Sequence, residues 1–331
     1  LSAATIYKLL GVRTKDDESS GNGYFEFGPD NLLDVDLLVV DETSMVDLAL
    51  MQALLLAVPA TAHIIFMGDK DQLPSVGPGS VLSDFLQLPF DHHRLNQTHR
   101  NDGGLLDVVK QAGTGRVDLI SRDDVDFHCA LPEASADSIA SVLAHYDRAI
   151  AVNFGDFSKV GLLIARRKGD PLSPGWNTTY LNAVLRQRYN PESGKRVNIN
   201  GVEGAVRACA GDRVFGTRHR VGDRVIIRKN LVLKKDGQSD SDVPEQVVNG
   251  DTGLIVEFSV SKGNLDCIHI ATTVHTAQGS EYANIIFICV NGHSSFVHRG
   301  IVFTAFSRAK KHLTVIGEAA VIQSEVARLA P

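Results

Sequence analysis

Short apolar runs and longer amphipathic stretches alternate along the first third of the chain. Apolar runs at 36–40 and 63–67 are too short for free-standing helices, and an amphipathic stretch from Met45 to about Ala57 lies between them. Ser44 and Asp47, at the start of that stretch, have the spacing of a helix capping box. Because buried parallel strands read as continuous apolar runs, the pattern predicts a strand–helix–strand unit of a parallel sheet.

The same alternation returns in the rest of the chain, with one interruption. It predicts helices at 137–146 and 178–188 and strands at 160–165, 284–290 and 312–316. Between these elements, the segment from about 206 to 268 carries short apolar runs bounded by glycines, which is the pattern of a small β-barrel. We therefore predict an α/β chain with a first domain at 1–92 and a second at 93–331, into which the barrel is inserted.

Composition adds a class of protein and excludes others. The 331 residues are 44% hydrophobic, which is enough for ordinary cores, and the longest apolar stretch is interrupted by polar residues and a proline, so no membrane span is predicted. The four cysteines are scattered without a C-x-x-C pair, which predicts neither a disulfide framework nor a zinc site and fits the reducing cytoplasm. Trp176 is expected to be a packing anchor, with stacking on a base, from a position near the basic barrel, as the alternative.

Charge is unevenly distributed along the chain. Residues 1–92 carry 4 basic and 14 acidic side chains, a net −10, whereas residues 93–331 carry 29 and 25, a net +4, and the sum is the overall −6. The segment 206–235 alone has nine basic residues and two acidic ones. We therefore expect any nucleic-acid contact to be local and to lie in the second half, although the basic segment could equally be a solvated barrel face.

Acidic and amide side chains follow the two strands of the first domain where each strand ends. Asp41 and Glu42 follow the first strand, and Asp69 and Gln72 follow the second. Ligands of open α/β sheets bind outside the carboxyl ends of the strands, so these side chains are expected at one edge. An aspartate there can hold Mg²⁺, and the adjacent glutamate can orient a water for attack on phosphorus. The pattern predicts the catalytic half of a nucleotide hydrolase.

The phosphate-binding half of such a site is not found in the sequence. The pattern G-x-x-x-x-G-K-[ST] occurs nowhere between Leu1 and Pro331, and the segment 113–116 lacks both the lysine and the spacing. The chain also begins on a leucine, directly on a helix-like pattern. We expect from this that it is a fragment without the phosphate-binding loop, and that the polypeptide as written hydrolyses ATP poorly or not at all.

Seven segments resemble, in the family's order, the motifs of RecD-type superfamily 1 DNA helicases, the family of the exodeoxyribonuclease V alpha subunit. They are Thr5–Gly11, Asp41–Met45, Gly68–Leu73, Leu95–Arg100, Val248–Gly253, Thr273–Glu281 and Phe303–Lys310. No single segment is specific, but their order over nearly the whole chain is. The resemblance implies two RecA-like parallel-sheet domains, the first incomplete here, with an SH3-like β-barrel in the second. It also implies ATP and Mg²⁺ as cofactors and 5′-to-3′ movement along single-stranded DNA in recombination or repair.

The resemblance implies roles for individual residues. Asp41 would ligate Mg²⁺, Glu42 would activate the attacking water, and Gln72 would sense the γ-phosphate. Arg100 and Arg308 would neutralise charge on the transferring phosphoryl group, for which a guanidinium is well suited. The nucleotide-binding set implied is Asp41, Asp69, Gln278 and Glu281, the last of these at the ribose. The DNA-binding set expected is Thr273, His275, Pro74, Arg218, Arg220, Arg228 and Lys229.

An alternative function stays open. By resemblance, some conjugative relaxases carry a degenerate RecD-like copy that grips single-stranded DNA without hydrolysing ATP. A copy that no longer hydrolyses ATP should first lose the charged catalytic side chains. All of these are present in this chain, which favours the enzyme over the non-catalytic module. The expected partners are single-stranded DNA and other subunits of a recombination nuclease complex, with no membrane involved, in the cytoplasm.

Overall fold

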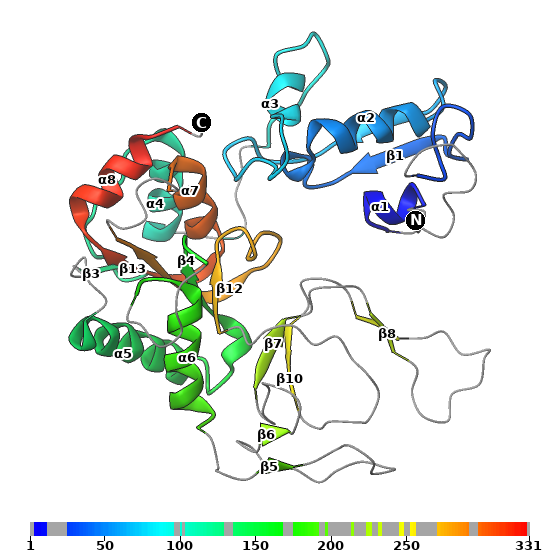
Figure 1. Ribbon diagram of the computed structural model, residues 1–331. Helices are drawn as coiled ribbons and strands as arrows, with labels where there is room; N and C mark the ends of the chain where they lie inside the picture. Colours follow the sequence, from blue (N-terminus) through cyan, green and yellow to red (C-terminus); the bar gives the residue numbers. More distant parts are fainter. Residues whose placement is uncertain are drawn as a thin grey trace. The chain divides into compact units, whose positions relative to one another are not determined.

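The chain separates into two units, residues 1–98 (unit 1) and residues 99–331 (unit 2). The computed structural model describes residues 3–11, 25–95, 100, 103–128, 135–167, 175–191, 196–197, 213–214, 223–226, 231–233, 245–247, 252–255, 270–290 and 297–329. Figure 1 shows the elements of both units along the chain. Among these described residues, no helix has the length and apolar character that a membrane span requires.

Unit 1 is built on a parallel pair of strands. Its elements are α1 (Ile6–Leu9), β1 (Leu37–Val40), the 3-10 helix η2 (Thr43–Met45), α2 (Leu48–Ala57), β2 (His63–Phe66) and α3 (Val81–Phe85). The register pairs Leu37 with His63 and Val40 with Phe66. The predicted strand–helix–strand unit is therefore confirmed: β1, α2 and β2 follow one another along the chain as the apolar pattern indicated.

The predicted start of α2 is wrong by about one turn. Asp47 is the N-cap, because its Oδ1 accepts a hydrogen bond of 2.8 Å from the Leu50 N–H. Ser44 lies inside η2, and the extended backbone of Val46 (φ −87°, ψ 120°) separates that turn from α2. Ser and Asp are both good N-caps, so the pattern alone did not decide between them.

The core of unit 1 lies between the strands and α2. Val40, Met51 and Leu54 are buried in it, and the alternation of a strand brings Leu38 to the same face. Leu37 and Val39 point to the opposite face and are 49% and 45% exposed. The helix therefore covers one face of the described sheet and fixes which strand positions face inward.

Unit 2 contains a five-stranded, all-parallel sheet with the order β11-β4-β12-β13-β3. Its elements are α4 (Gly103–Thr114), β3 (Val125–His128), α5 (Ala136–Val152), the 3-10 helix η3 (Phe157–Lys159), β4 (Val160–Ile164), α6 (Thr178–Tyr189), β11 (Ala271–Thr273), β12 (Tyr282–Cys289), α7 (Arg299–Ser307), β13 (Ala309–Gly317) and α8 (Ala319–Ala327). The predicted strands and helices are present, and so is a helix that was expected to end near Ala309 and ends at Ser307 as α7, whereas α4, β3, η3, β11 and α8 were not predicted.

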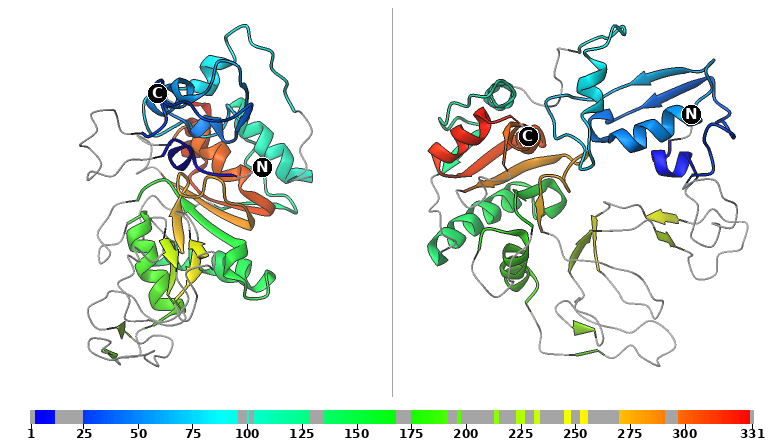
Figure 2. Two further views of the ribbon diagram at one scale, coloured as in Figure 1. Left: turned by 90° about the vertical axis from the view of Figure 1, so that its right-hand side faces the viewer. Right: turned by 45° about the horizontal axis from the view of Figure 1, so that its top comes forward.

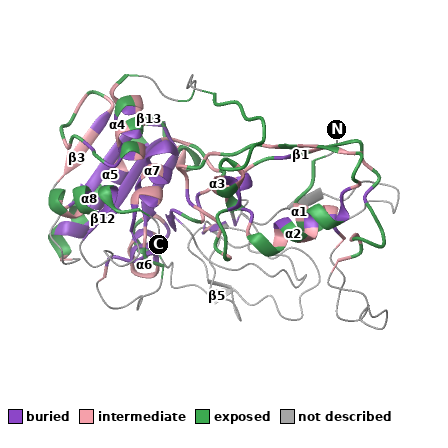
Figure 3. Cartoon of the chain, turned by 90° about the horizontal axis from the view of Figure 1, so that it is seen from above, coloured by how far each residue is buried: buried purple, intermediate pink, exposed green. Residues whose placement is uncertain are grey.

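Helices cover both faces of this sheet, as Figure 2 shows from two further directions. α5 and α6 pack on one face through a cluster that includes Tyr146, Leu181 and Ile286, and Trp176 is buried in the same cluster, as predicted. α4, α7 and α8 lie together on the other face, where the Phe306 ring meets Phe287 edge-on. The central strands are buried on both sides (purple in Figure 3), which explains their continuous apolar sequences.

The segment predicted to form a barrel is described only in short pieces. They are β6 (Arg213–Val214), β7 (Arg224–Ile226), β8 (Leu231–Leu233), β9 (Glu245–Val247) and β10 (Thr252–Leu254), preceded by β5 (Arg196–Val197). β7 pairs with β10 and β8 with β9, both antiparallel, and β5 pairs with β6 in parallel. Apart from Asp223 and Ile255, the rest of 206–268 lies outside the described residues, so closure into a barrel stays a prediction.

One buried ion pair ties this segment to α6. Asp223, just before β7, is 1% exposed and accepts hydrogen bonds from Arg186 Nε (3.1 Å) and Nη2 (2.7 Å). Asn190 Nδ2 donates to the same carboxylate at 2.8 Å. A bidentate guanidinium with an added amide satisfies the lone pairs of a carboxylate, which is what a buried charge requires.

Candidate functional site

The carboxyl end of β1 presents two acidic side chains at the edge of the unit 1 sheet. The exposed Asp41 accepts a hydrogen bond of 2.8 Å at Oδ1 from the Glu42 N–H. Glu42 has a left-handed backbone (φ 50°, ψ 41°), a conformation that costs a non-glycine residue about 1–2 kcal/mol. The buried Thr43 closes the turn, because its hydroxyl donates to Val40 O at 3.1 Å and its N–H to Met67 O at 2.9 Å.

Gly68 lets the two strand-end loops of unit 1 approach each other. A Cβ at this position would lie 2.9 Å from Leu82 Cδ2 and 3.2 Å from both the Thr43 and the Ser44 nitrogen atoms. Contacts as short as these would force the backbone to move, so a side chain at this position would separate the loop after β2 from η2. The glycine therefore sets the distance between the acidic pair and the residues that follow β2.

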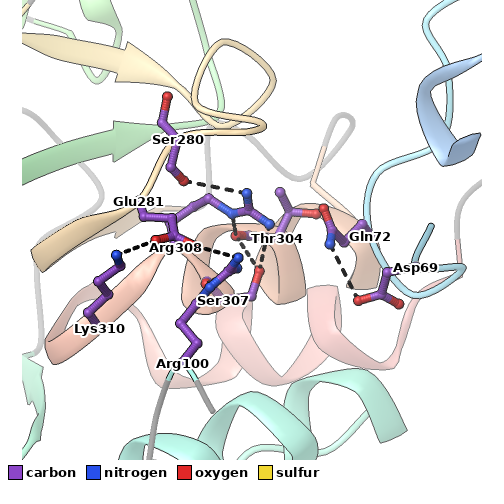
Figure 4. A network of polar contacts seen from close by, with 9 residues as sticks. All are labelled: Asp69, Gln72, Arg100, Ser280, Glu281, Thr304, Ser307, Arg308 and Lys310. Carbon is purple, nitrogen blue, oxygen red and sulfur yellow. Dashed lines mark hydrogen bonds and ion pairs between the residues drawn. The ribbon is translucent and has the colours of Figure 1, made fainter. Parts of the chain in front are cut away.

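The loop after β2 holds Asp69 and Gln72 together. Asp69 Oδ1 accepts from the Asp71 N–H at 3.0 Å, and Oδ2 accepts from Gln72 Nε2 at 3.4 Å, the contact drawn in Figure 4. The Gln72 N–H also donates to Asp69 O at 3.2 Å, and the adjacent Leu73 is buried. The structure thus gives Asp69 contacts within its own loop, where it orients Gln72, and Pro74 follows half-buried.

In unit 2, a carboxylate lies between two cations at the amino ends of β12 and β13. Glu281 Oε1 is 2.5 Å from Arg100 Nη2, and Glu281 Oε2 is paired with Lys310 Nζ (Figure 4). The hydrogen bond from Lys310 has the largest effect on the pKa of Glu281, burial opposes it, and the charge of Arg100 adds to it, so that the pKa lies below its usual range. Arg100 Nη1 also donates to Ser307 O at 3.2 Å.

Arg308 is buried inside unit 2, with 1% of its surface exposed. Its Nε donates to Thr304 O at 3.2 Å, its Nη1 to Ser280 O at 3.4 Å and its Nη2 to Ser307 Oγ at 3.3 Å. These contacts join the end of α7 to the turn before β12 (Figure 4). The guanidinium is therefore part of the internal hydrogen bonding of unit 2, which the family resemblance did not indicate.

The remaining predicted residues of unit 2 follow β11. Thr273 is buried at the end of that strand, and its hydroxyl contacts Thr276 Oγ1 at 2.9 Å and accepts from the Thr276 N–H at 3.3 Å. His275 is exposed in the turn that follows, and Gln278 is half-buried. The turn ends at Gly279, whose φ of 75° suits glycine, before the chain reaches Glu281.

Four predicted residues cannot be placed, and one residue at the site was not predicted. Arg218, Arg220, Arg228 and Lys229 lie outside the described residues, so their DNA-binding role stays a prediction. Lys310 was not singled out from the sequence, although it ends the last motif segment. Its signal was weak, because Lys310 is one of two adjacent lysines and such a pair is typical of a solvated strand surface.

Comparison with known proteins finds matches across most of the chain. The family model described as "AAA domain" matches residues 1–127, and that of the "UvrD-like helicase C-terminal domain" matches residues 270–316. The ATP-dependent RecD2 DNA helicase of Deinococcus radiodurans is 30% identical over 99% of this chain and 41% of its own length. The RecBCD enzyme subunit RecD of Mycolicibacterium smegmatis is 27% identical over 100% of this chain and 58% of its own.

A solved structure also matches most of the chain. The Pif1 helicase from Bacteroides, in complex with ADP-AlF3 and single-stranded DNA, is 15% identical, covering 98% of this chain and 80% of that chain with a TM-score of 0.49. The chain spans only 41% and 58% of the two curated relatives named above.

Proposed function

Because the chain belongs to the RecD-type family of superfamily 1 helicases, we propose that it works as part of an ATP-driven motor that moves 5′-to-3′ on single-stranded DNA. The observation that carries this is the acidic pair at the end of β1, held by the turn at Thr43 at the edge where α/β sheets bind their ligands. The proposed setting is recombination or repair in the cytoplasm, with other nuclease-complex subunits as partners.

The acidic pair fits a magnesium–nucleotide complex. Asp41 is exposed and offers hard carboxylate oxygens, and Mg²⁺ is typically held by one or two carboxylates together with substrate phosphates. When bound, the ion would neutralise charge on the β- and γ-phosphates of ATP. Glu42 would orient the attacking water, since the left-handed turn holds it directly after the Mg²⁺ ligand. Gln72, held by Asp69, would contact the γ-phosphate.

Unit 2 would supply positive charge to the same reaction. Arg100 is about one-third exposed and is held by an ion pair that a phosphate can replace, so we assign it to the transferring phosphoryl group. Arg308 would act there only after a change in its internal contacts, and otherwise would fix the turn that carries Glu281. Glu281 and Gln278 would complete the nucleotide site.

Single-stranded DNA is proposed to bind through unit 2. The net charge of −10 over residues 1–92, against +4 over the remainder, supports this, because an acidic surface repels phosphate. Thr273 and His275 would contact the DNA backbone from the turn after β11. The basic segment that contains Arg218, Arg220, Arg228 and Lys229 would add most of the electrostatic attraction.

The test is ATP hydrolysis by the full-length gene product, measured with and without single-stranded DNA. Glu42→Gln should lower turnover at least a hundredfold while nucleotide affinity stays within about threefold, because the amide cannot serve as the base and Asp41 remains. Glu26→Gln, at an exposed position of unit 1 outside the motif segments, is the matched control. DNA binding without any turnover in the parent would favour the alternative, a non-catalytic DNA-binding module.

A further inference from the structure

We propose that Lys310 is a positioning residue of the nucleotide site. Lys310 holds the Glu281 carboxylate in place while Arg100 exchanges that carboxylate for a nucleotide phosphate. The inference rests on the proposed function, because it takes Arg100 to be a phosphate contact. It adds to that function a residue, Lys310, that has no role in it so far, and it gives a reason for the ion pair between Arg100 and Glu281.

The geometry gives each cation its own oxygen of Glu281. Arg100 approaches Oε1 at 2.5 Å, and Lys310 approaches Oε2 (Figure 4). Glu281 directly precedes β12, and Lys310 lies near the start of the neighbouring β13, where the register pairs Tyr282 with Ala309. The Lys310–Glu281 pair therefore joins two hydrogen-bonded strands of the sheet. Arg100 reaches the pair from outside the sheet, from a position that precedes α4 in the chain.

The two cations are held in place differently, and this decides which of them can leave Glu281. Lys310 and Glu281 are fixed by the backbone pairing of β12 with β13, whereas Arg100 is held by its side-chain contacts to Glu281 and to Ser307 O. A polyphosphate carries more negative charge than a single carboxylate, and its oxygens can accept a guanidinium bidentately. Arg100 is thus the partner that a phosphate would take from Glu281, and Lys310 the one that stays.

Lys310 makes that exchange easier for two reasons. While Arg100 is paired, the carboxylate charge is shared between two cations, so Arg100 is bound less strongly than it would be by Glu281 alone. After Arg100 has left, Lys310 still neutralises Glu281, whose side chain is only 30% exposed and would otherwise lose its charge partner. Removing the lysine should therefore favour the state in which Arg100 is retained by Glu281.

The neighbouring Lys311 provides a matched control. It carries the same charge one residue later, and successive side chains of a strand point to opposite faces, so it cannot replace Lys310 at Glu281. Both lysines are exposed, so neither substitution should prevent folding. Lys310→Met, Lys310→Arg and Lys311→Met can thus be compared in the full-length protein.

The first measurement does not depend on ATP hydrolysis. In ¹³C-glutamate-labelled protein, the carboxyl resonance of Glu281 is assigned by its loss in Glu281→Gln and followed through a pH titration. Lys310→Met should raise the pKa of Glu281 by about one unit, because an adjacent cation commonly lowers a carboxyl pKa by that much or more. Lys310→Arg and Lys311→Met should leave the titration near that of the parent. An unchanged titration in Lys310→Met would overturn the proposal.

The second measurement links the lysine to Arg100 through Glu281. Lys310→Met should lower kcat/KM for ATP about fivefold or more, and Lys310→Arg should restore most of it. In a Glu281→Gln background, which no longer retains Arg100 by charge, the same substitution should change kcat/KM less than twofold. Equal losses in both backgrounds would mean that Lys310 does not act through Glu281. A parent without any turnover would overturn the proposed function and the exchange with it, while the titration would still decide whether Lys310 holds Glu281.

Discussion

Arg100 and Arg308 have the same role by family resemblance but very different surroundings. Arg100 is about one-third exposed and is held mainly by an ion pair. Arg308 is buried and donates to the carbonyl oxygens of Thr304 and Ser280. A guanidinium used inside a unit stabilises the fold in addition to any contact with a ligand, so the two arginines are expected to differ in what their loss costs.

Substitution of the two arginines by alanine should separate folding from chemistry. Arg308→Ala removes three hydrogen bonds from a buried position and should destabilise unit 2 by about 2–4 kcal/mol. Arg100→Ala should change the free energy of unfolding by less than about 1 kcal/mol, as is usual for half-exposed ion pairs, while lowering kcat at least a hundredfold. Urea unfolding followed by circular dichroism, together with steady-state ATP hydrolysis, measures both. An Arg308→Ala protein as stable as the parent would contradict the structural role.

At the residue scale, the sequence predicted the position of the acidic pair but not how the cations are held. Asp41 and Glu42 follow a strand, so their place at the sheet edge could be read from chain order alone. The Glu281–Lys310 pair depends on the pairing of β12 with β13, which no local pattern encodes. The burial of Arg308 likewise depends on the turn at Ser280, distant from it in sequence.

At the element scale, α5 ends with an unusual residue. Gly155 N–H donates to Ile150 O at 3.0 Å and Phe154 N–H donates to Ala151 O at 3.1 Å, which are the two hydrogen bonds of a Schellman motif at a helix C-terminus. Phe154 occupies the left-handed position (φ 57°), where glycine or asparagine is usual, and its side chain is 97% exposed. The strained backbone is thus not offset by burial of the ring.

Phe154→Gly should therefore stabilise unit 2 by about 1 kcal/mol, because it removes the steric cost of a left-handed L-residue and loses almost no buried surface. Phe154→Ala is the matched control: it removes the ring but keeps a Cβ, so its effect should stay within about 0.5 kcal/mol of the parent. Chemical denaturation of the three proteins decides this. A destabilised Phe154→Gly would show that the ring makes a contact that contributes to stability.

At the scale of the whole molecule, pH should act on unit 2 through one half-buried and one buried imidazole, those of His145 and His298. Burial, and then the adjacent His128, lower the pKa of His145, and burial, followed by His275, lowers the pKa of His298. A group with a lowered pKa in the folded state binds fewer protons there than in the unfolded state. Its contribution to stability is therefore complete above the unfolded pKa of about 6.5 and is lost as pH falls toward the folded pKa.

The melting temperature of unit 2 should consequently decrease as the pH is lowered from 7.5 to 5.5. His298→Gln should make this dependence on pH shallower. His92→Gln, at an exposed position of unit 1, should leave it unchanged. Thermal unfolding at several pH values, in buffers of equal ionic strength, measures the slope. A dependence that is the same in His298→Gln and in the parent would exclude a role for this histidine.

The order of the sheet in unit 2 was the part of the fold that sequence analysis could not supply. Apolar runs identified β4, β12 and β13 one at a time, because each is buried on both faces. Their neighbours are set by packing of helices from distant parts of the chain, and β3, with the less apolar sequence VDFH, gave no clear signal. Sequence therefore predicted the class of unit 2, and the structure supplied its strand order.

That strand order has a consequence for synthesis on the ribosome. β4 ends at Ile164, yet its two neighbours in the sheet begin only at Ala271 and Tyr282. β3, which ends at His128, pairs with β13, which begins only at Ala309. The strands β3 and β4 must therefore wait, without their neighbours in the sheet, until the segment 271–317 has been translated. Unit 2 should be the slow-folding part of the nascent chain and the part that most needs a chaperone.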